Sequence, residues 1–299
     1  MKALRALLLA AALAQVVACA IVDRADDIVG HHTRIVSLVP AATEMLFAVG
    51  AGSRVIAVSS FDHYPPDVEK LPRVGALLDP DVERILSLRP DLAIVFDGQK
   101  ELREKLAQAR IEVFPYGRPS LADIPKTMRA LGQLAGRGQQ AREAAAALER
   151  GLKDVASQAS DSGRDAGPRR VMLVIGREPG SLRNIYVSGG VGFLADILNL
   201  LHQRNAFGEV HRENLQVSTE SILAAQPDVI IEVVASRPWS AEEISREEHV
   251  WDQLGSLPAV RFHRVRMLVG DEFVIPGPRV VRAARELAQA MRPLEGTAR

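Results

Sequence analysis

Two glutamates occupy the same position in a sequence motif that occurs twice in the chain. Glu83 lies in VERILSLRPDLAIVF, and Glu220 lies in TESILAAQPDVIIEV. A carboxylate can form strong, directional pairs with arginine side chains. It also complements the helix dipole when it lies in the first turn of a helix. Asp81 and Ser218, two residues before each glutamate, are residue types that begin helices, so both roles stay open from the residues alone.

Patterns that would support catalysis or a resident metal are missing. The chain has neither G-x-S-x-G nor H-E-x-x-H, the motifs that hold a nucleophilic serine or a catalytic zinc. Gly190, Gly192 and Ala195 fit the dinucleotide pattern G-x-G-x-x-A, but no ribose-binding acid is clearly placed. We interpret these glycines as letting a helix begin close to a cleft. His63 and Tyr64 are adjacent and point opposite ways in an extended stretch, which disfavours joint metal ligation. The sequence predicts no enzyme, no cofactor and no metal.

Strand and helix patterns alternate along most of the chain, which favours sheets covered by helices on both faces. In the first half, strands are expected at 34–39, 54–60, 91–96 and 111–117, and helices at 42–50, 82–90, 100–110 and 121–135. In the second half, strands are expected at 170–176, 185–190, 228–234 and 265–270, and helices at 191–201, 219–226, 240–254 and 278–291.

A segment rich in Ala, Glu, Arg, Lys and Gln separates the two halves and predicts one long helix over 138–160. The predicted fold is therefore α/β, with an N-terminal lobe at 34–137, a C-terminal lobe at 161–299, and mostly parallel sheets flanked by helices. A single helix between lobes resists bending, because bending breaks its internal hydrogen bonds. We expect a cleft between the lobes that opens only slightly.

The first residues resemble a targeting segment. Lys2 and Arg5 precede an apolar run that ends in VVAC, which predicts a signal peptide over 1–18 and Cys19 as a lipid attachment site. The alternative is an ordinary secretory signal with Cys19 incidental. Residues 19–33 are interpreted as a tether in which two histidines are solvated. Equal numbers of acidic and basic residues, 37 of each, give no sign of nucleic-acid binding.

The ordered set RIVSLVPAATEMLFAVGAGSRVIAVSSFDHYPP, LPRVG, VERILSLRPDLAIVF, NLQVSTESILAAQPDVIIEV and PGPRVVRAARELA resembles the substrate-binding proteins of ABC importers for iron complexes, haem and vitamin B12. The opening half is most similar to the vitamin B12-binding members. The resemblance implies two lobes bridged by a long helix. It also implies that Glu83 and Glu220 dock on the two permease subunits.

Loops that follow strands are expected to line the ligand cleft, because ligands of open α/β sheets bind at the carboxyl ends of the strands. The candidates are Pro40, Ala41, Thr43, Phe61, His63, Tyr64, Leu77, Arg177, Asn214, Trp239, Phe273 and Arg279. Among these, Phe61 suits a flat macrocycle, and Arg279 suits a carboxylate or phosphate. Core packing for Phe61 and a contact at a helix start for Arg279 are the alternatives.

The chain departs from the vitamin B12-binding pattern at two positions, since Leu77 and Asn214 stand where that pattern has tryptophans. It also has Ala76 and Leu77 where haem-binding relatives have a tyrosine ligand. We therefore expect a monomeric, lipid-anchored protein of the periplasm or cell surface that delivers a metal chelate to an ABC permease with its ATPase subunits. A cobalamin-like corrinoid is favoured over an iron–siderophore complex, with haem third. A metallochaperone or enzyme on similar lobes is the alternative of another class.

Overall fold

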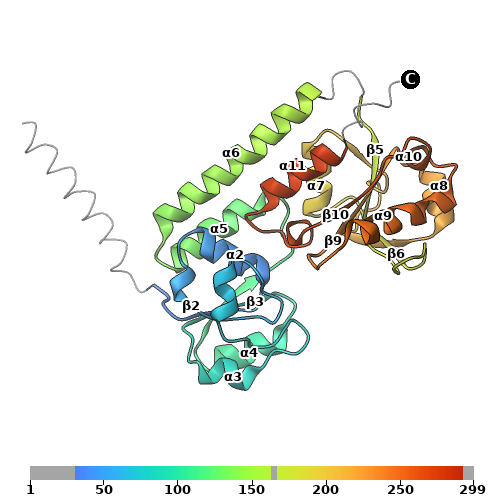
Figure 1. The fold of residues 1–299 in the computed structure, drawn as a ribbon. Coiled ribbons are helices and arrows are strands. Elements are labelled where there is room, and N and C mark those ends of the chain that lie inside the picture. Colours follow the sequence, from blue (N-terminus) through green and yellow to red (C-terminus); the bar gives the residue numbers. More distant parts are fainter. Residues whose placement is uncertain (1–30, 163–166, 292–299) are drawn as a thin grey trace, which may run out of the picture. The chain divides into compact units, whose positions relative to one another are not determined.

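The computed structural model describes residues 31–162 and 167–291, which form two compact units (Figure 1). The first unit runs to Gly117 and includes Thr127–Ala145. The second comprises Arg118–Lys126 and the chain from Ala146 on. The predicted signal peptide and Cys19 lie outside the described residues. The sequence placed the short segment Arg118–Lys126 with the first lobe, whereas a hydrogen bond from the Leu121 N–H to Asp196 ties it to the second unit.

The first unit contains a four-stranded sheet in the order β2-β1-β3-β4, with every pair parallel. Its strands are β1 (Ile35–Ser37), β2 (Val55–Val58), β3 (Leu92–Phe96) and β4 (Glu112–Tyr116). All of β1 and nearly all of β3 are buried. Strands covered on both faces read as continuous apolar runs, which is why the sequence located them.

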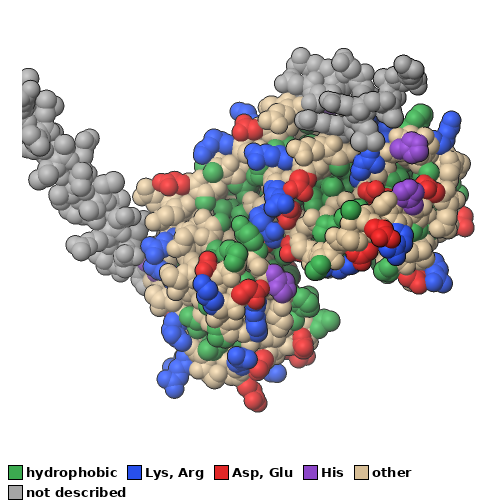
Figure 2. All heavy atoms as spheres, in the orientation of Figure 1, with side chains coloured by type: hydrophobic (Ala, Val, Ile, Leu, Met, Phe, Trp, Pro, Cys, Tyr) green, Lys and Arg blue, Asp and Glu red, His purple; other side chains and the backbone are tan. Residues whose placement is uncertain are grey.

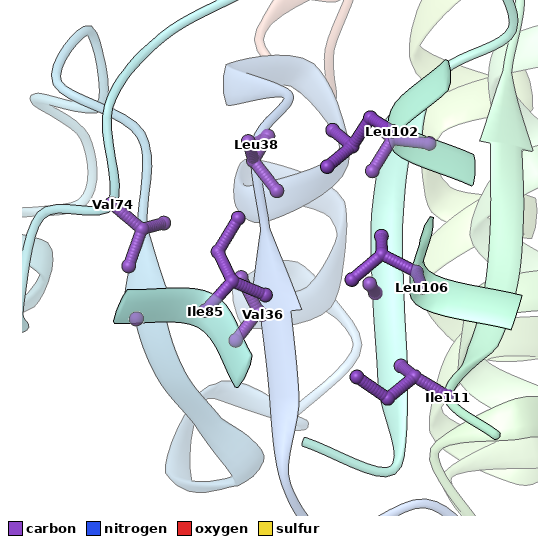
Figure 3. Packing of buried hydrophobic residues seen from close by; sticks show 10 residues of the cluster. Val36, Leu38, Val74, Ile85, Leu102, Leu106 and Ile111 are labelled. Carbon is purple, nitrogen blue, oxygen red and sulfur yellow. The ribbon is translucent and has the colours of Figure 1, made fainter. Parts of the chain in front are cut away.

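Helices cover the first sheet. They are α2 (Pro40–Ala48), α3 (Val82–Ser87), α4 (Lys100–Gln108) and α5 (Asp123–Leu134), with the 3₁₀ turns η1 (Gly52–Arg54) and η2 (Pro66–Lys70). One core cluster joins Val36 of β1 to Ile85 of α3 and to Leu102 and Leu106 of α4 (Figure 3). The short α3 therefore packs through the fully buried Ile85 and the partly buried Val82, and it leaves Glu83 and Arg84 of its first turn exposed.

The second unit contains a mixed sheet in the order β10-β9-β5-β6-β8, with β7 paired to β5. Its strands are β5 (Arg170–Gly176), β6 (Ile185–Ser188), β7 (Arg204–Asn205), β8 (Asn214–Val217), β9 (Val229–Val234) and β10 (Val265–Val269). The pairs of β9 with β5 and β10 are parallel, whereas β6 runs antiparallel to β5 and β8. The sequence did not predict β8, because NLQV alternates between exposed and half-buried residues and lacks a long apolar run.

The helices of the second unit are α7 (Phe193–Leu200), α8 (Thr219–Ala225), α9 (Ala241–His249), α10 (Pro258–Arg261) and α11 (Val280–Ala290), with the 3₁₀ turns η3 (Val250–Leu254) and η4 (Asp271–Phe273). Trp251 of η3 is fully buried in a core cluster with Met172, Val174 and Ile230 of the sheet. The predicted fold class, α/β with mostly parallel sheets flanked by helices and one long helix between the halves, is confirmed.

The long helix α6 runs without interruption over Gly138–Ser162, 25 residues, which corresponds to roughly 37 Å at 1.5 Å per residue. Buried residues recur along it every three or four positions, at Ala141, Ala145, Leu148, Leu152 and Val155. A Cβ at Gly151 would lie 2.9 Å from a methyl group of Val281, so the glycine lets α11 pack closely against α6. The prediction of a helix over 138–160 matches these bounds within two residues.

Charges of both signs are interspersed on the visible face of each unit (Figure 2). This agrees with the equal totals of acidic and basic residues. Within the described ranges, none of the helices combines the length and apolar character needed to cross a bilayer.

Candidate functional site

Each unit exposes one of the two repeated glutamates at the start of a helix. Glu83 is the second residue of α3, and Glu220 is the second residue of α8; both are exposed. The Asp81 side chain accepts a hydrogen bond from the Arg84 N–H at 2.9 Å, and the Ser218 hydroxyl accepts from the Ser221 N–H. These side chains cap the helices, so neither glutamate is needed as a cap and both carboxylates face solvent.

The carboxylate of Glu220 is favoured in its ionised form. A hydrogen bond from the Ser218 side chain lowers the pKa of Glu220, and the backbone N–H of Glu220 itself acts in the same direction. The repeated motif therefore forms the same local structure in each unit, a capped helix with an exposed acid in its first turn.

Three loops meet at the carboxyl edge of the first sheet. The Ser60 N–H donates to the Gly75 carbonyl at 2.8 Å, and the Gln99 side chain donates to the Leu77 carbonyl at 2.8 Å. These loops expose large apolar side chains, with Phe61 64% and Leu78 94% accessible. Tyr64 and Leu77 are also exposed. We call Phe61, Tyr64, Leu77 and Leu78 the apolar edge of the first unit.

Polar groups brace the loop that carries Phe61. Arg73 donates through Nη1 to the carbonyls of Ser59 and Asp62, and through Nη2 to Glu69 at 2.9 Å. Asp62 is buried, and its Oδ2 accepts from the Ser59 N–H and hydroxyl. Burial raises the pKa of Asp62 against these opposing hydrogen bonds. The loop is thus fixed from below while Phe61 stays accessible.

The remaining candidates of the first unit differ in exposure. Thr43 and Ala41 are buried, and the Thr43 hydroxyl donates to Ser37 at 2.8 Å, so these two residues serve the interior. Pro40 is half-buried as the first residue of α2. His63 is exposed, with its ring 3.3 Å from a Glu69 oxygen.

Arg177, expected in the cleft, lies in the interior of the second unit. Its side chain is 1% exposed and contacts Glu232 at 2.9 Å and Glu247 at 2.8 Å. The guanidinium also lies 5.8 Å from the Trp251 ring centroid. Burial raises the pKa of Glu232, and the charge of Arg177 opposes that shift. Every side of the guanidinium is used within the protein, so a ligand would have to displace these partners.

The loops after β9 and β10 are also tied to the protein. Phe273 is fully buried. Arg279 donates to the buried carboxylate of Glu272 at 2.9 Å, the internal contact that the sequence left as the alternative. Ser236 and Asp271 bond each other reciprocally, since each backbone N–H donates to the other side chain.

Trp239 lies in the loop after β9 and is half-buried. The guanidinium of Arg237 lies 3.1 Å from the centroid of its ring, and Arg237 also approaches Glu243 at 3.5 Å. The indole Nε1 has no hydrogen-bond partner among the described residues. One face of this tryptophan is therefore already covered by a cation.

Asn214 is exposed at the start of β8 and lines a hollow of about 590 Å³ within the second unit. The hollow is lined by Arg118, Ser120, Asp123, Val191, Gly192, His211, Arg212, Glu213 and Asn214. Apart from Asn214 and Gly192, sequence reasoning did not single out these residues. Arg118 directly follows the Gly117 that ends a predicted strand, which was the available signal.

The two histidines of the predicted tether are not simply solvated. The ring of His32 is mostly buried and lies between Asp91 at 3.4 Å and Glu112 at 3.1 Å. Across the described part of the chain, no group of three or more His, Cys, Asp or Glu side chains is arranged to hold a metal ion.

Known proteins with similar sequences and structures support a family assignment. The family model described as periplasmic binding protein matches residues 35–271, more than half of the chain. The vitamin B12-binding protein of Pectobacterium atrosepticum is 30% identical over 268 residues, covering 88% of this chain and 89% of that protein. An uncharacterized ABC transporter substrate-binding lipoprotein of Bacillus subtilis, YvrC, is 27% identical, covering 87% and 80%.

A solved structure shares the fold. The periplasmic vitamin B12-binding protein BtuF of Vibrio cholerae matches with a TM-score of 0.73 and 27% identity, covering 87% of this chain and 96% of that one. The resemblance inferred from the ordered motifs is thereby confirmed. The chain belongs to the periplasmic binding protein family.

Proposed function

We propose that this protein is the extracytoplasmic substrate-binding protein of an ABC importer, and that it captures a metal-chelate nutrient and delivers it to a permease. Membership of the periplasmic binding protein family and the similarity to an ABC transporter substrate-binding lipoprotein support the transport role. Its mechanism is capture and delivery without a chemical step, and it needs no cofactor of its own.

The observation that carries the proposal is the pair of exposed acids. Glu83 and Glu220 occupy the same helix position, one in each unit, and neither is used as a cap. Two acidic points of this kind suit a partner with two equivalent basic sites, such as a dimeric permease. The partner complex then contains the permease dimer and its ATPase subunits.

For the ligand we favour a cobalamin-like corrinoid, with an iron–siderophore complex or haem as alternatives. The similarity to vitamin B12-binding proteins supports the corrinoid. The apolar edge of the first unit supports a ligand with a broad apolar face, because Phe61 on a braced loop and Leu78 on the neighbouring loop present accessible apolar surface. A panel of cyanocobalamin, haem, a ferric hydroxamate and a ferric catecholate separates these ligands. Binding of the ferric siderophores without cyanocobalamin would move the assignment to iron.

The protein is also proposed to be a monomer anchored to a membrane by lipid on Cys19. The similarity to a protein named a lipoprotein supports the anchor. Cys19→Ser is expected to release the protein from membrane fractions. Retention of the variant in the membrane would contradict the anchor without affecting the transport role.

Charge reversal at both acids tests docking directly. Glu83→Arg combined with Glu220→Arg is expected to reduce uptake to background while the purified protein keeps its ligand affinity, because only the permease contact changes sign. Each single variant is expected to lose part of the uptake.

The chain offers a matched control. Glu101 of α4 and Glu242 of α9 are also exposed second residues of helices, one in each unit. Glu101→Arg with Glu242→Arg therefore makes the same change in net charge and helix-dipole interaction. Equal uptake by the two double variants would rule out docking through Glu83 and Glu220.

A further inference from the structure

The hollow beside Asn214 is richer in available cations than in available acids. Two carboxylates line it, and both have partners. Asp123 accepts from the Ser120 hydroxyl at 2.6 Å and from Lys126 at 2.9 Å. These hydrogen bonds lower the pKa of Asp123 to about 2. Its carboxylate is therefore ionised, and groups of the protein already stabilise the negative charge. Glu213 pairs with Arg118 at 3.1 Å.

The cationic side chains of the hollow are less engaged. His211 and Arg212 are exposed, and within the described ranges neither side chain has a hydrogen-bond or ion-pair partner. The Arg118 side chain is 82% exposed and pairs with Glu213 at the surface. The hollow therefore offers one unpaired guanidinium, one imidazole and a second guanidinium on a weak surface pair.

The backbone that presents these side chains is fixed. The N–H of Gly189 donates to the Glu213 carbonyl at 2.9 Å, and the N–H of Gly190 donates to the Val210 carbonyl at 2.8 Å. A Cβ at Gly190 would lie 2.1 Å from the Gly208 carbonyl, so only glycine permits this approach. Gly190, one of the glycines that fit a dinucleotide pattern, thus holds the 208–213 loop together with Gly189.

From these observations we propose that the hollow is a subsite for a free carboxylate of the ligand, with Arg212 as its main contact and Arg118 and His211 as flanking donors. A guanidinium binds a carboxylate through parallel N–H bonds, and a preformed backbone reduces the ordering cost of that contact. The inference rests on the proposed function and narrows its substrate class to chelates with anionic side groups.

The test uses chelates that differ in a carboxylate. Cobyric acid has one free carboxylate where cobinamide has an amide, and haem has two where its dimethyl ester has none. In whichever pair binds, the acid is expected to bind about tenfold more tightly than its neutral counterpart. Arg212→Gln is expected to remove that difference and leave the affinity for the neutral member unchanged. Glu213→Gln is expected to increase the preference, because it frees Arg118.

Arg285→Gln is the control, since Arg285 is exposed on α11 of the same unit and does not line the hollow. It should keep the preference for the acid. Equal affinity for the two members of a pair, or a preference that survives Arg212→Gln, would overturn the subsite. If neither pair binds, the proposed corrinoid and haem ligands fail. Titration with citrate, followed through the backbone amide resonances of Gly192 and Arg212, then tests the subsite. If citrate shifts these resonances no more in the wild type than in Arg212→Gln, the subsite is overturned.

Discussion

The loops at the carboxyl edges of the two sheets differ in whether their side chains are exposed or buried. In the first unit, Phe61 is exposed on a loop that Arg73 holds in place, and Leu78 is exposed on the neighbouring loop. In the second unit, Arg177 and Phe273 occupy the corresponding places after strands but are buried. The same topological rule selected Phe61, Arg177 and Phe273 as ligand contacts, together with Leu77, the neighbour of Leu78. What separates them is whether the neighbouring elements already supply a partner.

The second unit has such partners. The acids Glu232 and Glu247 converge on Arg177, and Glu272 is buried against Arg279. A buried charge is tolerated only when it is paired and hydrogen-bonded. These ion pairs therefore make the edge of the second unit a structural element. The accessible functional groups of this unit lie instead around Asn214.

Substitution of Arg177 should produce the largest change, a decrease in the free energy of unfolding. Arg177→Gln leaves Glu232 and Glu247 close together without their cation, and removal of one partner from a buried ionic cluster typically costs about 3–5 kcal/mol. We expect a decrease of that size in the free energy of unfolding, measured in urea. Ligand affinity of the folded fraction should be unchanged.

Arg183 provides the control for this prediction. It follows the same strand but is largely exposed, and it pairs with Glu178 at the surface. Arg183→Gln should change stability by no more than about 0.5 kcal/mol. A comparable loss for the two variants, or a ligand affinity that falls with Arg177→Gln, would show that the edge of the second unit is not purely structural.

The sequence predicted the elements well because apolar runs and capping residues are local signals. The strands of the first sheet, the long helix α6 and the caps Asp81 and Ser218 all follow from neighbouring residues. Side-chain burial at the strand ends depends on distant partners. Arg177 meets Glu232 from 55 positions away and Glu247 from 70, and no local pattern encodes that meeting.

The same limit explains the residues that were missed. Arg118 and Glu213 are 95 positions apart and meet only because the Arg118–Lys126 segment joins the second unit. Thr43 appeared to follow a strand end, but α2 begins at Pro40 and turns the Thr43 side chain toward Ser37. A pattern locates an element to within a few residues, whereas the contacts of a side chain depend on its direction.

A substitution in the apolar edge of the first unit should have the opposite effect to Arg177→Gln, changing ligand affinity but not stability. Phe61→Ala removes an apolar surface that the folded protein leaves in solvent, so stability should change by less than about 0.5 kcal/mol. If the ligand covers this ring, affinity should fall by about 1–2 kcal/mol, roughly five- to thirtyfold. Isothermal titration with the ligand selected from the panel measures the change.

Phe262 is the matched aromatic, since it is exposed in the second unit away from the strand ends that were considered. Phe262→Ala should leave affinity unchanged. If Phe61→Ala destabilises the protein without weakening binding, the ring contributes to packing and the apolar edge is not a contact surface.

The smallest expected effect concerns Asp62. It is a buried acid, like those of the second unit, but it lies in the loop that exposes Phe61 in the first unit. Glu232 has an arginine partner, whereas one oxygen of Asp62 has no hydrogen-bond partner among the described residues. Burial raises the pKa of Asp62 above 3.8, so the folded state binds its proton more tightly than the unfolded state does. This contribution to stability is present below pH 3.8 and is lost as pH rises through the raised folded pKa.

The difference in unfolding free energy between wild type and Asp62→Asn isolates this proton, because the other carboxylates cancel. That difference should decrease as pH rises from 3.8 through the raised pKa, with a slope no steeper than about 1.4 kcal/mol per pH unit for one proton. A flat difference for Asp62→Asn, or one that increases with pH, would mean that the loop carrying Phe61 accommodates the ionised acid, and that its rigidity comes from Arg73 alone.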